Sequence, residues 1–110
     1  MTDAPATEWH RAARLSEIPA DEPMAARIGN RLIALYRIDG RIYATDNICS
    51  HEFAELSQGF LDGEIIECPL HQARFHVPTG KVVGPPATED IAVFPVRVEG
   101  DDVLVGLPKR

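Results

Sequence analysis

The sequence has few cysteines and no long hydrophobic run. Its two cysteines are Cys49 and Cys68, and each is followed two or three residues later by a histidine. In so short a chain this pattern favours metal binding over a disulfide framework. No segment approaches the roughly 20 apolar residues that span a bilayer, and residues 1–11 lack the apolar core of a signal peptide. We therefore expect a cytoplasmic protein that does not engage a membrane.

Basic residues are also scarce. The chain has 11 Lys and Arg residues against 17 Asp and Glu residues, and its formal net charge is -6. This balance argues against a nucleic-acid backbone or an anionic membrane as a partner. The stretch from residue 52 to residue 67, called the acidic segment below, has five acids and no base: Glu52, Glu55, Asp62, Glu64 and Glu67. We expect it, above all Glu52 and Glu55, to dock a basic partner surface, although such charges also commonly just face water.

The patterning of the chain indicates one all-β domain. A length of 110 residues and a hydrophobic content of 45% fit a single globular unit. Residues 31–38 and 41–45 read as strands around Asp39-Gly40, a dipeptide whose tolerance of positive φ favours a type I′ hairpin turn. This hairpin is the clearest structural signal in the chain.

Further strands are predicted nearer the C-terminus. Residues 91–98 and 103–105 form a second hairpin, in which Pro95 marks an edge or a bulge. The remaining predicted elements are strands at residues 64–67 and 74–77 and single helical turns at residues 12–18 and 52–57. The second cysteine and histidine therefore lie between strands.

The two cysteine–histidine pairs carry the chemistry. They read Cys49-Ser50-His51 and Cys68-Pro69-Leu70-His71, with sixteen residues between them. Residues two apart in an extended loop point to the same side, so Cys49 and His51 can converge on one centre. Zinc fingers keep their cysteines together and their histidines together. The alternating order instead suits a Rieske [2Fe-2S] centre, in which two cysteines bind one iron and two histidines bind the other.

Motifs around these pairs carry a wider resemblance. They are Gln58-Gly-Phe-Leu61, the E-C-P-L-H-Q-x-R-F run from Glu67 to Phe75, Thr79-Gly-Lys81 and the proline loop Gly84-Pro85-Pro86-Ala87. From about Trp9 onward, the chain resembles the Rieske ferredoxins of bacterial multicomponent aromatic-ring-hydroxylating dioxygenases. The resemblance implies that the proline loop covers a cluster.

The resemblance also implies a fold, a cofactor and partners. The fold is a Rieske-type antiparallel β-sandwich with a small cluster-binding subdomain inserted: residues 1–8 form a flexible N-terminus, residues 9–110 a single domain, and residues 47–87 approximately the cluster-binding part. The implied ligands of one [2Fe-2S] cluster per chain are Cys49 and Cys68 on the buried iron and His51 and His71 on the outer iron. The donor would be an NAD(P)H-dependent flavoprotein reductase and the acceptor a terminal oxygenase.

An electron carrier is expected rather than an enzyme. A Rieske oxygenase also needs a mononuclear iron on two more histidines and a carboxylate, in a much longer chain, and only His10 and His76 remain here. We expect His10 to lie on the surface and His76 to be satisfied by local contacts. Two alternatives stay open, namely the small Rieske-like subunit of an NADH-dependent nitrite reductase and a non-redox zinc-binding interaction module.

Four positions depart from the Rieske subunits of respiratory cytochrome complexes. Those subunits join their ligand loops by a disulfide where this chain has Ala54 and Leu70, and they place serine and tyrosine hydroxyls where it has Ala73 and Phe75. Hydrogen bonds to the cluster sulfurs favour the reduced state. Without those hydroxyls we expect a reduction potential that is low for the Rieske class.

Overall fold

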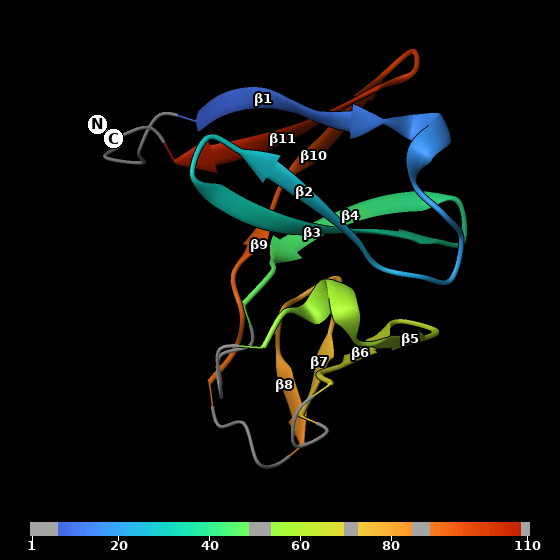
Figure 1. Cartoon of the computed structure of the whole chain (residues 1–110), viewed down its shortest axis with the longest axis vertical. Helices are drawn as coiled ribbons and strands as arrows, with labels where there is room; N and C mark the ends of the chain where they lie inside the picture. Colours follow the sequence, from blue (N-terminus) through green and yellow to red (C-terminus); the bar gives the residue numbers. More distant parts are fainter. Residues whose placement is uncertain (1–6, 49–53, 70–72, 85–88, 109–110) are drawn as a thin grey trace.

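The computed structural model describes residues 7–48, 54–69, 73–84 and 89–108. Within these ranges the chain is built of strands and two single-turn 3-10 helices, and no helix there is long and apolar enough to cross a membrane. Figure 1 shows a larger part, built from the two ends of the chain, above a smaller part built from its middle. The expected all-β fold is confirmed.

The larger part consists of two antiparallel sheets with the orders β1-β11-β10 and β2-β3-β4-β9. Its elements are β1 (Thr7–Arg14), η1 (Leu15–Glu17), β2 (Met24–Ile28), β3 (Arg31–Ile38), β4 (Arg41–Asp46), β9 (Val93–Phe94), β10 (Val96–Glu99) and β11 (Asp102–Pro108). Strand β1 pairs with β11 from Thr7 onward. This pairing joins the two ends of the described chain in one sheet.

The β3–β4 hairpin forms as the sequence predicts. Asp39 and Gly40 have φ values of 51° and 77°, the left-handed conformation that a type I′ turn requires at both central residues. Ile38 pairs with Arg41 directly across the turn. Since asparagine, aspartate and glycine tolerate this backbone best, the dipeptide sets the register of the hairpin.

Pro95 moves the chain from one sheet to the other. Strand β9 pairs with β4, whereas β10, which starts at the next residue, pairs with β11. Proline has no N–H to donate to a ladder, so it falls at the break between the two strands. The predicted continuous strand over residues 91–98 is therefore wrong: it is two short strands, and Ile91 and Ala92 belong to neither.

The smaller part is a four-stranded antiparallel sheet with the order β5-β6-β7-β8. Its elements are η2 (Leu56–Gln58), β5 (Phe60–Asp62), β6 (Ile65–Glu67), β7 (Arg74–His76) and β8 (Val82–Gly84). Leu61, Ile66, Phe75 and Val82 lie across from one another in register, and all four pack in one apolar cluster with Leu56 of η2. The predicted strands at residues 64–67 and 74–77 are confirmed to within one residue.

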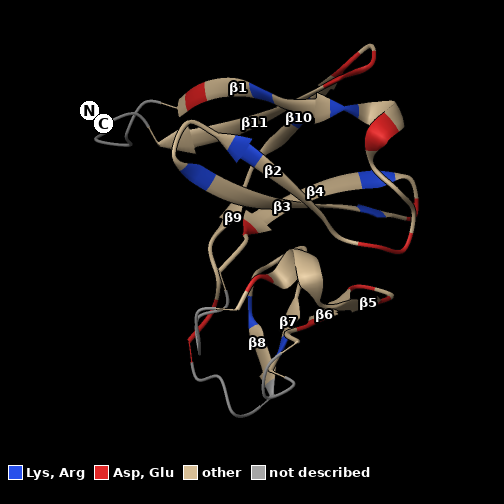
Figure 2. Cartoon of the chain, viewed as in Figure 1, with Lys and Arg blue, Asp and Glu red and all other residues tan. Residues whose placement is uncertain are grey.

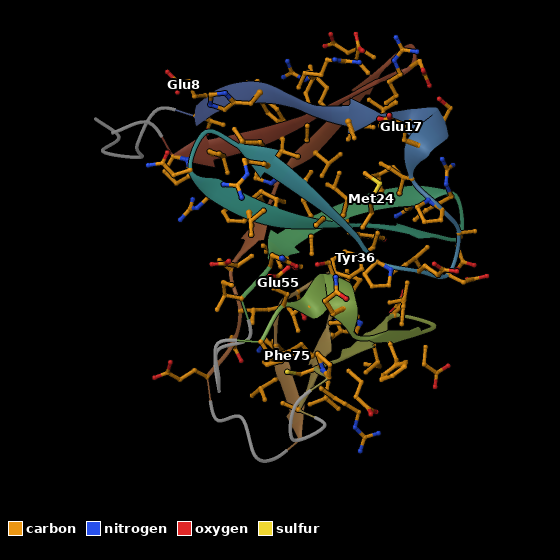
Figure 3. All side chains as sticks on the ribbon, in the orientation of Figure 1. Glu8, Glu17, Met24, Tyr36, Glu55 and Phe75 are labelled. Carbon is orange, nitrogen blue, oxygen red and sulfur yellow. The ribbon has the colours of Figure 1, made fainter. Side chains whose placement is uncertain are left out.

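Strand β3 belongs to both parts. Ile33 and Leu35 pack in the core between the two large sheets, whereas Ala34 and Tyr36 pack in the cluster that contains the small sheet. Successive residues of a strand point to opposite faces, so one strand supplies both cores. Tyr36 is fully buried where the two parts meet (Figure 3).

Two local predictions differ from the structure. Of the helical turn predicted at residues 12–18, the first three residues continue strand β1, and only Leu15–Glu17 is helical. The turn predicted at residues 52–57 appears later, as Leu56–Gln58, while residues 52 and 53 lie outside the described ranges. Both helices are too short to show a 3.6-residue period, which is why the sequence indicates them poorly.

Candidate metal centre

Cys68 is the one expected ligand that the described ranges contain, since Cys49, His51 and His71 lie outside them. Cys68 follows strand β6 and is 1% exposed. Its main-chain N–H donates to the carbonyl oxygen of Ala73 at 2.7 Å, which ties the end of β6 to the start of β7. The segment that carries His71 in the sequence is therefore closed at its base by the small sheet.

The segment that contains Cys49 and His51 is also held at both ends. It leaves strand β4 through Asn47 and Ile48 and returns at Glu55, and Ile48 and Glu55 form an isolated antiparallel bridge. Ala54, just before the bridge, is 6% exposed and packs in the same cluster as Cys68. The two candidate ligand segments thus share one buried core.

The expected proline loop begins at the same edge of the small sheet. Glu67 pairs with Arg74, and Arg74 pairs with Gly84, so the end of β6, the start of β7 and the end of β8 form one row. Pro85 and Pro86 themselves fall outside the described ranges. Beyond them, Asp90 Oδ1 accepts a hydrogen bond from Val82 N at 2.9 Å, which holds the returning chain against β8.

The surroundings of Cys68 suit a metal-bound thiolate. The buried residues packed in its cluster include Ala54, Leu56, Ala73 and Phe75, which have no polar side-chain atoms. A thiolate in so dry an environment needs a cation to offset its charge, and soft thiolates prefer metals such as zinc or the irons of an iron–sulfur cluster. The residues present therefore fit the expected group.

The two spare histidines are engaged elsewhere, as expected. His76 Nε2 lies 2.8 Å from Glu64 Oε1, and its Nδ1 lies 2.9 Å from Thr79 Oγ1. His10 Nε2 lies 3.2 Å from Glu8 Oε1 on the surface. Both ring nitrogens of His76 are thus used in local contacts, which confirms its structural role.

Tyr36 and Thr45 form a buried polar pair, and Thr45 lies near the end of strand β4, which leads to the segment that contains Cys49 and His51. The Tyr36 hydroxyl lies 2.8 Å from Thr45 Oγ1, which in turn donates to the carbonyl oxygen of Asp46 at 2.9 Å. Because the hydroxyl hydrogen of Thr45 is donated to Asp46, the Tyr36 hydroxyl is the donor in the bond between Tyr36 and Thr45. Burial raises the pKa of the Tyr36 hydroxyl, so it stays protonated and keeps this donor role.

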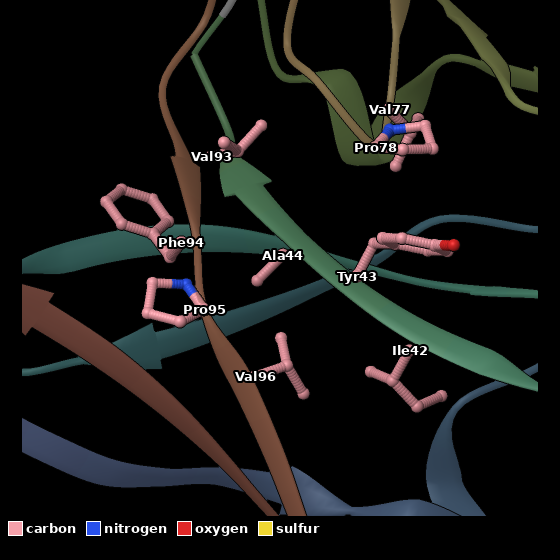
Figure 4. A pocket seen from close by; sticks show the side chains of 9 residues that line it. All are labelled: Ile42, Tyr43, Ala44, Val77, Pro78, Val93, Phe94, Pro95 and Val96. Atoms are coloured by element: carbon pink, nitrogen blue, oxygen red, sulfur yellow. The ribbon is translucent and has the colours of Figure 1, made fainter.

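A cavity of about 380 Å³ lies where β4, β9 and the Val77-Pro78 turn meet (Figure 4). Tyr43 is the only titratable residue among those that line it, and the others are apolar. The lining offers no pair of an acid and a base for catalysis.

One residue of this region was missed by sequence reasoning. Asn47 is fully buried between strand β4 and the first cysteine, and its side chain makes two hydrogen bonds. No motif or periodicity singles out an asparagine at this place, so only the contacts reveal it.

The fold and the site together define a class: an all-β protein with a candidate metal centre, in which the bases of two loops share one small buried core. A model of the Rieske [2Fe-2S] domain matches residues 8–95. The chain belongs to the Rieske [2Fe-2S] domain family. This family supports the Rieske iron–sulfur cluster that the sequence predicts as the cofactor.

Known proteins place the chain within this family. It is 45% identical over 100 residues to the ferredoxin component of the naphthalene 1,2-dioxygenase system of Pseudomonas aeruginosa, covering 91% of this chain and 96% of that one. Among solved structures, a Sphingomonas yanoikuyae B1 ferredoxin is 33% identical with a TM-score of 0.87, covering 92% of this chain and all of that one. A ferredoxin bound to the oxygenase of carbazole 1,9a-dioxygenase is 36% identical with a TM-score of 0.84, covering 93% and 95%.

These relatives confirm the expected kind of protein. They are named as ferredoxins and ferredoxin components, that is, electron carriers rather than catalytic subunits. The resemblance drawn from the cysteine–histidine pairs and the surrounding motifs is therefore confirmed at the level of the family.

Proposed function

We propose that this chain carries single electrons in the cytoplasm, from an NAD(P)H-dependent flavoprotein reductase to a terminal aromatic-ring-hydroxylating oxygenase. One [2Fe-2S] cluster per chain would be held by Cys49 and Cys68 on one iron and by His51 and His71 on the other. The observation that carries this proposal is Cys68, buried in an apolar cluster that both candidate ligand segments share. The solved complex of a related ferredoxin with an oxygenase supports the acceptor.

The cluster, when bound, would accept and return one electron at a potential between about -150 and +300 mV. The buried apolar residues around Cys68 would keep water from its side of the cluster. Ala73 and Phe75 are fully buried and contribute no hydroxyl hydrogen to this space. They line the site with hydrocarbon, which favours the oxidised form relative to a site with hydroxyl donors.

The acidic segment supplies the proposed docking charge, with one change from the sequence-based expectation. Glu55 is half-buried and its carboxylate accepts a hydrogen bond from Asn47 at 3.2 Å, so it is a structural residue and not a free surface charge. Glu64 contacts His76. Asp62 is exposed on the β5–β6 hairpin, where Figure 2 shows acidic positions, and it is the better candidate for steering a basic partner.

Metal analysis tests the central claim. The purified full-length chain, expressed with adequate iron, should contain two irons and two acid-labile sulfides and should show visible absorption. A His71→Ala variant should lose the iron or hold it weakly, because an open iron site admits solvent. Stoichiometric zinc and a colourless protein would overturn the proposal and favour the zinc-binding module instead.

The carrier role is tested by reconstitution. With the reductase and oxygenase of its own system, oxidation of an aromatic substrate should require this chain and should stop with the His71→Ala variant. Full activity without the chain would exclude the carrier role.

A further inference from the structure

Asn47 is a buried polar residue next to the first ligand segment. It lies directly after strand β4 and two residues before Cys49, and within the described ranges Thr45 and Asn47 are, with the Tyr36 hydroxyl, the buried polar side chains. Its main-chain N–H donates to the carbonyl oxygen of Leu32 at 3.4 Å. A buried amide is costly unless its hydrogen bonds are made, so its partners indicate what it does.

The other partners of Asn47 all lie where the first segment returns. Asn47 Oδ1 accepts from the main-chain N–H of Ser57 at 2.8 Å, and Asn47 Nδ2 donates to Glu55 Oε1 at 3.2 Å. The main-chain oxygen of Asn47 accepts from the N–H of Leu56 at 2.7 Å. Asn47 therefore contacts three consecutive residues across the base of the segment.

Asn47 also caps helix η2 from a distance. The first N–H groups of a helix have no partner within the helix, and Glu55, at the N-cap position, makes no side-chain capping bond. The N–H groups of Leu56 and Ser57 are instead satisfied by the main-chain and side-chain oxygens of Asn47. Leu56 is fully buried in the cluster that contains Cys68, so the cap links the base of the first segment to the second.

We propose that Asn47 is the positioning residue for Cys49 and His51, an inference that rests on the proposed cluster ligands. By joining the two ends of residues 48–55, Asn47 limits where that segment can place its thiolate and its imidazole relative to Cys68. Its amide is suited to this because one side chain must donate to Glu55 and accept from Ser57 at the same time.

Substitution separates positioning from simple packing. Asn47→Ala removes both side-chain bonds and leaves the part-buried N–H of Ser57 without its acceptor. Asn47→Asp keeps the acceptor but sets a second carboxylate against Glu55. Combining Asn47→Asp with Glu55→Gln reverses the donor and the acceptor of that bond. The double variant should therefore restore the hydrogen bond that joins the two ends of residues 48–55. Asn30→Ala, at an exposed position in the β2–β3 turn, is the matched control.

The readouts are cluster lifetime and electronic structure. In the intact protein under an iron chelator, Asn47→Ala and Asn47→Asp should shorten the half-life of the visible absorption about 10- to 100-fold, the range by which loss of a residue that orients metal ligands lowers metal affinity or activity. Both should also shift the midpoint potential and the electron paramagnetic resonance of the reduced protein. The double variant should return all three values toward wild type, and Asn30→Ala should leave them unchanged.

The outcomes separate this inference from the proposed function. A wild-type chain without iron would overturn both. If the wild type holds its cluster and the Asn47 variants keep its lifetime, potential and spectrum while only their unfolding temperature falls, then Asn47 is merely a packing residue and this inference is wrong. If the double variant folds but its cluster lifetime, potential and spectrum do not return toward wild type, the bond between residues 47 and 55 does not position the ligands, and the inference is wrong.

Discussion

The main-chain N–H of Cys68 donates to the carbonyl oxygen of Ala73 at 2.7 Å, so these two buried residues close the base of the second ligand segment. Ala73 also packs in the same buried cluster as Cys68. The size and polarity of that side chain therefore matter for the redox chemistry proposed there.

Adding hydroxyls at Ala73 and Phe75 should raise the reduction potential. The wild type should lie toward the lower end of the Rieske range, near about -150 mV, and Ala73→Ser or Phe75→Tyr should move it upward, because a new donor to the cluster sulfurs stabilises the reduced form. Protein-film voltammetry at neutral pH measures this shift. Ala25→Ser, at an exposed position of β2, is the control. A wild-type value near about +300 mV would contradict the assignment of these positions.

Asp62 should speed the encounter with a basic partner. Asp62→Asn removes one exposed charge beside the small sheet, and since exposed ion pairs contribute about 0.2–1 kcal/mol, stopped-flow reduction or oxidation by the partner should slow about twofold at low salt. The rates should converge at high salt, where the Debye length is about 3 Å. Glu99→Gln, on the β10–β11 hairpin of the larger part, should leave the rate unchanged. Equal rates for both variants at every salt concentration would show that the acidic segment only faces water.

Gly80 should resist substitution more than Gly63. Both have positive φ, 77° and 61°, which costs roughly 1–2 kcal/mol for a residue with a Cβ. A Cβ at Gly80 would also overlap the carbonyl oxygen of Ile91, whereas a Cβ at Gly63 would meet open space. In urea unfolding, Gly80→Ala should therefore lower the free energy of unfolding by clearly more than Gly63→Ala does. Equal losses would mean that the Ile91 backbone moves aside.

Tyr36→Phe should destabilise the protein by about 0.5–1.5 kcal/mol, because Thr45 loses the one hydrogen bond that its hydroxyl oxygen accepts from Tyr36. Urea unfolding at equal cluster content measures the change. Tyr43→Phe is the matched control, since the Tyr43 side chain is half-buried and its hydroxyl bonds to none of the described residues. A Tyr36→Phe variant as stable as this control would show that the buried bond contributes nothing.

The sequence predicts best where one local signal decides the structure. Asp39-Gly40 specifies its hairpin because few residues tolerate positive φ, and the spacing of the cysteines and histidines specifies a metal chemistry. It predicts less well where long-range contacts decide. The short strand Met24–Ile28 has an alanine-rich sequence and is a strand because it pairs with β3. Asn47 and Glu55 look like ordinary polar residues until folding brings them within hydrogen-bonding distance.

The double duty of strand β3 limits how this protein can be engineered. A fragment spanning only residues 47–91 would leave behind Ala34 and Tyr36, and the small sheet would lose the apolar wall on which Leu56 and Phe75 pack. The smaller part therefore cannot be transferred to another protein by itself. A graft onto another scaffold must carry β3 with it, or rebuild that wall from the host's own side chains.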